Sequence, residues 1–65
     1  MGILEEYLKY CLHMAMRDHP QVFMHQAFGG VQYYLFVRPD EQEEVEELWD
    51  KYKPQFEELI YGGAP

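Results

Sequence analysis

The sequence predicts a small α+β domain in which a helix, a β-hairpin and a second helix follow one another, in the order α-β-β-α. Three observations predict this fold. Near each end of the chain, apolar residues recur at steps of three and four, as on amphipathic helices. The middle contains two runs of β-branched and aromatic residues, 22–28 and 31–37. Gly29 and Gly30 join these runs and suit the positive φ angles of a tight hairpin turn.

The chain is expected to form one domain over residues 1–65, because it contains no repeat, linker or low-complexity tract. The predicted parts are a helix over 3–18, a hairpin over 21–37, a kinked helix over 40–61 and a flexible tail over 62–65. An alternative makes 20–28 a short helix, with Pro20 in its first turn and Gly29 as its stop. That alternative gives a mostly α-helical fold.

The first predicted helix has an unusually wide apolar arc. One stripe consists of Leu4, Tyr7, Leu8, Cys11, Leu12 and Ala15, and an adjacent stripe of Ile3, Tyr7, Tyr10 and Met14. A helix that lies on a single neighbour needs an apolar stripe of only about 100°. This helix is therefore expected to contact two neighbours, one of them a second copy of the chain. The helix should end at His19, because the residue before a proline is disfavoured in the helical region.

The two faces of the predicted hairpin are expected to pack against different neighbours. One carries Val22, Met24, Phe28, Val31, Tyr33, Leu35 and Val37 and can hold the two helices. The other carries Phe23, His25, Ala27, Gln32, Tyr34 and Phe36 and is too apolar to be left to water. A lone two-stranded hairpin is also marginally stable. We therefore predict a homodimer that self-associates through Phe23, His25, Tyr34 and Phe36 of the hairpin and Tyr10 and Met14 of the first helix.

The last predicted helix, over 40–61, is apolar on one side. The apolar stripe consists of Val45, Leu48, Trp49, Tyr52, Phe56, Leu59 and Ile60. Asp40 follows Pro39 and is the expected N-cap, with Glu43 three residues on as in a capping box. Pro54 lacks a backbone donor and crowds the preceding turn, so a kink or a brief break is expected there.

Size and charge limit the classes of partner. A chain of 65 residues has a small core, and its single cysteine, Cys11, cannot form an intrachain disulfide, so self-association is the expected source of further burial. The net charge of −7 disfavours nucleic acid and anionic membrane as direct partners and favours a basic protein. Glu5 and Glu6 stand where a signal peptide would need positive charge, which predicts a cytoplasmic protein.

Residues with catalytic or metal-binding chemistry are few. His13, His19 and His25 are spaced by six residues, which does not place two ligands on one helical face. A metal site built from Asp18, His19 and His25 is the third functional hypothesis. Cys11 and His13 could suggest a thiolate and its base, but residues two apart on a helix point in different directions. No catalytic residue, cofactor or resident metal is therefore predicted.

The acidic side of the last helix is the most informative feature for function. It carries Glu43, Glu44, Glu46, Glu47 and Asp50. Such a face can be a solubility surface only, or it can dock on a basic groove of another protein and imitate nucleic-acid phosphates. We predict a small, acidic, non-catalytic interaction or regulatory protein, such as an inhibitor that covers a nucleic-acid-binding surface. A purely structural subunit of a homo-oligomer is the alternative.

Overall fold

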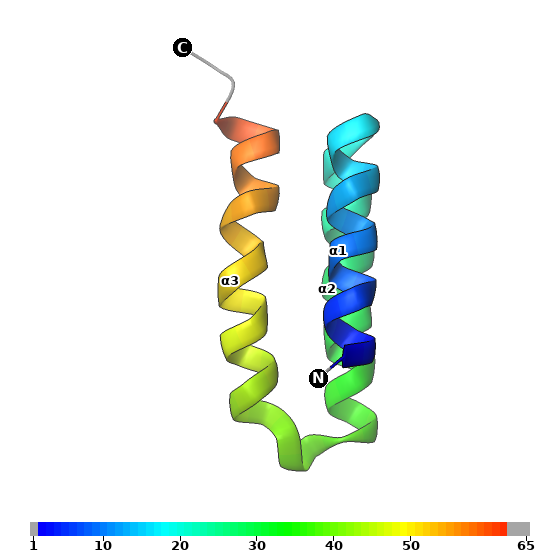
Figure 1. Ribbon diagram of the computed structural model, residues 1–65, viewed down its shortest axis with the longest axis vertical. Helices are drawn as coiled ribbons and strands as arrows, with labels where there is room; N and C mark the ends of the chain where they lie inside the picture. The colour runs from blue at the N-terminus through cyan, green and yellow to red at the C-terminus, as the bar shows by residue number, and fades with distance from the viewer. Residues whose placement is uncertain (1, 63–65) are drawn as a thin grey trace.

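Three successive α-helices run up, down and up again in the computed structural model, which describes residues 2–62 (Figure 1). They are α1 (Gly2–Arg17), α2 (Pro20–Val37) and α3 (Gln42–Tyr61), with a short 3-10 helix, η1 (Pro39–Glu41), before α3. The bundle is elongated, with extents of 41 × 17 × 16 Å. Apart from Gly62, the predicted flexible tail lies outside the described residues.

The predicted α+β fold is wrong, because the segment 21–37 is a helix and residues 2–62 contain no strand. The mostly α-helical alternative is confirmed, and the helix begins at Pro20 as that alternative expects. The alternative's stop at Gly29 is wrong, since α2 continues through both glycines to Val37. The boundaries of α1 agree with the prediction to within one residue at each end.

Helical spacing in α2 explains why it folds this way. The side chains that it turns toward the rest of the bundle recur at steps of three, four and one, and they are Phe23, Met24, Ala27, Val31, Tyr34 and Leu35. Only the helix brings Ala27 and Val31 into one buried core with the other helices. A helix also satisfies its own backbone groups, whereas a two-stranded hairpin leaves two edges unpaired.

Gly30 lies in α2 for a packing reason. A Cβ built on Gly30 would overlap the ring of Tyr7, which crosses from α1. The Tyr7 hydroxyl also donates to the carbonyl of Gln26, one turn earlier on α2, at 3.2 Å. The glycine therefore marks the close approach of α1 to α2 and not a turn, which is why the pair Gly29-Gly30 misled the prediction.

We expect opposite effects from alanine at the two glycines. Gly29→Ala should raise the free energy of unfolding by about 0.5–1 kcal/mol, because nothing lies within 4 Å of its Cβ and alanine is the better helix former. Gly30→Ala should lower it, because overpacking against Tyr7 costs about 1–3 kcal/mol and outweighs that gain. Urea denaturation in dilute solution measures both. Equal effects of the two changes would contradict the packing reason.

The core lies along the axis where the three helices meet. Its buried members are Leu4, Leu8, Cys11, Ala15, Ala27, Val31, Val45, Tyr52 and Phe56. The α1 and α2 contributions to this core include Ala15 and Ala27, whereas α3 contributes Val45 and the two largest members, Tyr52 and Phe56. Helices α1 and α2 contact each other more extensively than either contacts α3.

The turns between the helices have distinct backbone features. His19, between α1 and α2, has φ 44° and ψ 62°, the left-handed conformation, and Pro20 then starts α2 with the φ that a helix needs. At the second turn, the backbone N–H of Arg38 donates to the carbonyl of Tyr34 at 2.7 Å. The predicted N-cap residue, Asp40, lies within η1 instead, and no side chain caps α3.

Pro54 does not break the last helix. α3 is continuous from Gln42 to Tyr61, so the predicted brief break is absent. Pro54 is exposed, and the proline therefore lies on the solvent side of the helix, where water can reach the carbonyls that lose a backbone donor. One turn before it, the carbonyl of Lys51 accepts a hydrogen bond from the side chain of Gln55 at 3.2 Å.

Candidate functional site

The five predicted partner-binding acids form one exposed surface on α3. We call Glu43, Glu44, Glu46, Glu47 and Asp50 the acidic face, and all five side chains are exposed. The residues between and beyond them that point into the bundle are Val45, Tyr52 and Phe56, which are buried. The helical period thus places the carboxylates on the side of α3 that faces solvent.

Three of the five cations of the chain pair with acids outside this face. Lys9 approaches Glu6 at 3.7 Å, and Arg38 approaches Glu41 at 2.7 Å and Asp40 at 3.5 Å. Lys51, although it lies on α3, reaches across to Glu5 of α1 at 3.4 Å. Among residues 2–62, no ion pair involves the acidic face, and Glu46 accepts only from the neutral amide of Gln42, at 2.9 Å. The acidic face therefore has no counterion among the described residues.

A polar cluster fixes the turn from α2 to α3. The Tyr34 hydroxyl donates to Glu41 at 2.8 Å, and Arg38 bonds both Glu41 and Asp40. The hydrogen bond to the Glu41 carboxylate raises the pKa of Tyr34, and the hydrogen bond from Arg38 lowers the pKa of Asp40. Tyr34, predicted for self-association, is therefore engaged within its own chain.

Glu5 links the first and last helices. Its carboxylate accepts from the Tyr52 hydroxyl at 3.1 Å and from Lys51 at 3.4 Å. These hydrogen bonds, with that of Tyr52 the larger influence, lower the pKa of Glu5. Tyr52 is otherwise a core residue, 4% exposed. Sequence reasoning missed this link because the two partners are far apart along the chain.

We expect the stability contribution of Glu5 to depend on pH. A carboxylate whose pKa is lower in the folded chain than in the unfolded chain stabilises the fold above the unfolded value of about 4.5, and loses this effect as the pH falls through the folded value. Glu5→Gln should therefore destabilise the chain at neutral pH, and the difference from wild type should narrow in acid. Denaturation at both pH values, with Tyr52→Phe as the background control, measures this. A difference that persists unchanged in acid would contradict it.

The side of α2 that faces away from α1 and α3 is a second candidate surface. We call Val22, His25, Gln26, Gly29, Gln32, Tyr33 and Phe36 the outer face of α2, and all seven are exposed. Phe36 is 84% exposed, Tyr33 70% and Val22 58%. None of the 18 residues of α2 is Asp, Glu, Lys or Arg. Exposed aromatic side chains on an uncharged helix face are typical of an interaction surface.

The predicted self-association residues separate in the structure. His25 and Phe36 lie on the outer face of α2. Phe23 and Tyr34 are half-buried and pack against the core. Tyr10, 54% exposed, and Met14, half-buried, belong to α1. The alternating face that would have joined Phe23, His25, Tyr34 and Phe36 does not exist in a helix, whereas spacing of three and four would have found Val22, Gly29 and Tyr33.

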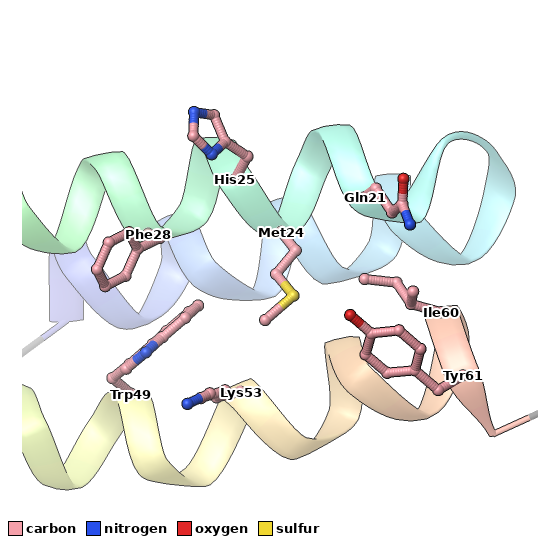
Figure 2. Close-up of a pocket in the computed structure, with 8 residues that line it drawn as sticks. All are labelled: Gln21, Met24, His25, Phe28, Trp49, Lys53, Ile60 and Tyr61. Atoms are coloured by element: carbon pink, nitrogen blue, oxygen red, sulfur yellow. The ribbon is translucent and has the colours of Figure 1, made fainter.

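The histidine and cysteine hypotheses gain no support from the geometry. His19 approaches Asp18 at 3.2 Å, but the described residues hold no group of three His, Cys, Asp or Glu side chains able to bind a metal. Figure 2 shows His25 pointing away from α3. Cys11 is fully buried, and burial raises the pKa of its thiol. A protonated thiol in the core is a poor nucleophile.

An apolar groove of about 390 Å³ lies between α2 and α3. In Figure 2, Met24 projects into it. The rings of Phe28 and Trp49 are tilted by 41° relative to each other, with their centroids 5.8 Å apart. The lining of the groove is Gln21, Met24, His25, Phe28, Trp49, Lys53, Ile60 and Tyr61. These residues offer no pair of acid and base within a dry pocket, as hydrolytic chemistry requires.

Comparisons with protein-family models, with curated proteins and with solved structures found no match to this chain. Within residues 2–62, none of the helices combines the length and the apolarity that crossing a bilayer requires. Two candidate surfaces stand out, the acidic face on α3 and the outer face of α2.

Proposed function

We propose that this protein is a small non-catalytic regulator that binds a basic surface of another protein through the acidic face of α3. The observation that carries the proposal is the placement of the ion pairs. Lys9, Arg38 and Lys51 pair with Glu5, Glu6, Asp40 and Glu41, and among the described residues no cation pairs with the acidic face. Carboxylates without an internal counterion are available to the cations of a partner.

The spacing of these carboxylates suits an extended basic groove. Glu43, Glu47 and Asp50 follow each other at steps of four and three, so they form a line along the helix with axial intervals of roughly 4.5–6 Å. A rigid helix presents this line without the entropy cost of ordering a loop. A net charge of −7 also attracts a basic partner at long range and increases the rate of encounter. A basic groove that binds nucleic acid is the partner surface that fits best, and the protein would inhibit by covering it.

The proposal places the protein in the cytoplasm, where a single thiol stays reduced. The proposed role is to bind another protein and not to catalyse a reaction. A purely structural role in a homo-oligomer remains the second proposal, and the observation that favours it is the uncharged outer face of α2. The two proposals use different helices.

Capture of partners from cell lysate by the immobilised protein tests the acidic face. Partners should be retained at low salt and released at half-molar salt, because screening weakens an electrostatic complex. The double variant Glu43→Lys with Glu47→Lys should lose them. The matched control, Glu6→Lys with Asp18→Lys, makes the same change in net charge on exposed residues away from α3 and should retain them. Capture that neither salt nor the α3 variant alters would contradict the proposal.

A further inference from the structure

The outer face of α2 differs from every other part of the chain in its charge. All five Lys and Arg and all twelve Asp and Glu lie outside α2. Two copies with a net charge of −7 repel each other wherever their acidic residues meet. The outer face of α2 itself presents no Asp or Glu to a second copy, and Glu46 and Asp50 lie at its edge, across a groove from Gln32. Its composition therefore suits a second copy of this chain.

Gly29 supplies an independent observation. It lies in the middle of α2 and is exposed, and a Cβ added there would meet no atom within 4 Å. Gly30, in contrast, is needed because Tyr7 occupies the space of its Cβ. Nothing within one copy requires a glycine at position 29, although glycine is a poor residue for a helix interior. A glycine on an exposed apolar helix face allows another backbone to approach closely.

The sequence of the outer face is symmetric in character about this glycine. Val22 and Phe36 each lie seven residues from Gly29, His25 and Tyr33 each lie four, and Gln26 and Gln32 each lie three. In an antiparallel helix pair with its two-fold axis at Gly29, residues at equal distances on opposite sides come to the same level. Val22 of one copy then meets Phe36 of the other. His25 and Gln26 of one copy meet Gln32 and Tyr33 of the other.

We propose that the protein forms a symmetric dimer through the outer face of α2, with two antiparallel α2 helices crossing at Gly29. The contact is apolar at both ends, polar but uncharged between them, and narrow at the centre. The two copies present the same patch to each other, as a closed two-fold interface requires.

The exposed area is adequate for such a contact. An aromatic side chain covers roughly 150–250 Å², so Tyr33 and Phe36 together offer roughly 300 Å² per copy. Val22 and the polar residues of the outer face extend the contact, and Ile3 and Val37, 86% and 54% exposed, add apolar surface. A standard interface buries roughly 800 Å² per partner, so the two aromatic side chains would supply about a third of it and the other residues the rest. The acidic face lies on another helix, so one dimer would carry two acidic faces.

Sedimentation equilibrium of the full chain at micromolar concentration, at low and half-molar salt, tests the dimer. The mass should be twice 7.8 kDa, and salt should strengthen association because it screens the repulsion between two acidic copies. The complex proposed for the acidic face weakens with salt, so the two proposals can fail separately. A mass of 7.8 kDa at both salt concentrations would overturn the dimer.

A charge placed at the crossing point tests its position. Gly29→Lys brings two like charges together on the two-fold axis and should weaken dimerisation at least about tenfold. Its helix should remain intact, which circular dichroism checks, because lysine is the better helix former. His13→Lys, the same added charge at an exposed position of α1, should leave the dimer unchanged. Loss of the dimer in both variants, or in neither, would overturn the proposal.

Disulfide trapping tests the antiparallel arrangement. A mixture of the variants Val22→Cys and Phe36→Cys should form a mixed disulfide between chains on mild oxidation, because those positions meet across the interface. Neither variant alone should crosslink to itself, and Cys11, which is fully buried, should not react. Self-crosslinking of Val22→Cys with no mixed product indicates parallel helices and would overturn the proposed arrangement.

Discussion

Phe56→Ala should lower the free energy of unfolding by about 3–5 kcal/mol, the largest loss expected from any single truncation in this chain. Phe56 is the largest of the fully buried side chains, and its ring also contacts that of Trp49, with centroids 6.1 Å apart. Domains of this length have a total stability of only about 3–10 kcal/mol. The variant should therefore be largely unfolded at room temperature, as circular dichroism and urea titration will show.

Met16→Ala is the matched control for this truncation. Met16 is 60% exposed on α1, so its loss should change the free energy of unfolding by no more than about 0.5 kcal/mol. Because both changes remove a large apolar side chain from a helix, their difference measures burial. Similar effects of the two truncations would mean that Phe56 does not lie in the core.

Pro54→Ala should have the opposite sign and raise the free energy of unfolding by about 2–3 kcal/mol. α3 is continuous through this position, so alanine can donate the backbone hydrogen bond to the carbonyl of Asp50 that proline cannot. Pro54 is exposed, and no core contact is lost with its ring. Thermal and urea denaturation measure the gain.

Pro20→Ala is the control for Pro54→Ala, because it shows whether removing any proline stabilises the chain. Pro20 is at the start of α2, where the missing N–H has no helical partner in any case and the fixed φ favours initiation. This change should leave stability unchanged or lower it slightly. A gain at Pro20 equal to that at Pro54 would mean that the position within the helix does not matter.

The two end helices could be predicted because their apolar and polar residues separate cleanly at helical spacing. The middle segment could not be assigned in the same way, since it is apolar nearly all around and fits a period of two as well as one of 3.6. Gly29-Gly30 then favoured a turn. The helix brings Ala27 and Val31 into one core with the other two helices, and Gly30 allows the close approach of Tyr7 from α1. Both contacts join separate segments and leave no local signal in the sequence.

The sequence predicted the acidic face of α3 better than it predicted the self-association surface. The five acids of α3 could be placed on the solvent side because Val45, Tyr52 and Phe56 define the opposite side, and they are exposed in the structure. Their role in binding stays a prediction. The self-association set mixed inward residues, Phe23 and Tyr34, with outward ones, because strand alternation was applied to a helix.

The absence of Lys, Arg, Asp and Glu from α2 has a chemical consequence of its own. Proteases that cleave beside charged side chains find no site between Arg17 or Asp18 at one end and Arg38 at the other. Reagents that modify amines or carboxylates likewise have no target in that interval. Digestion by such proteases therefore leaves residues 19–37 uncut, with both the buried side of α2 and the patch around Gly29 on a single peptide. Because Pro39 follows Arg38, a protease that cuts after arginine releases a peptide that extends past Arg38.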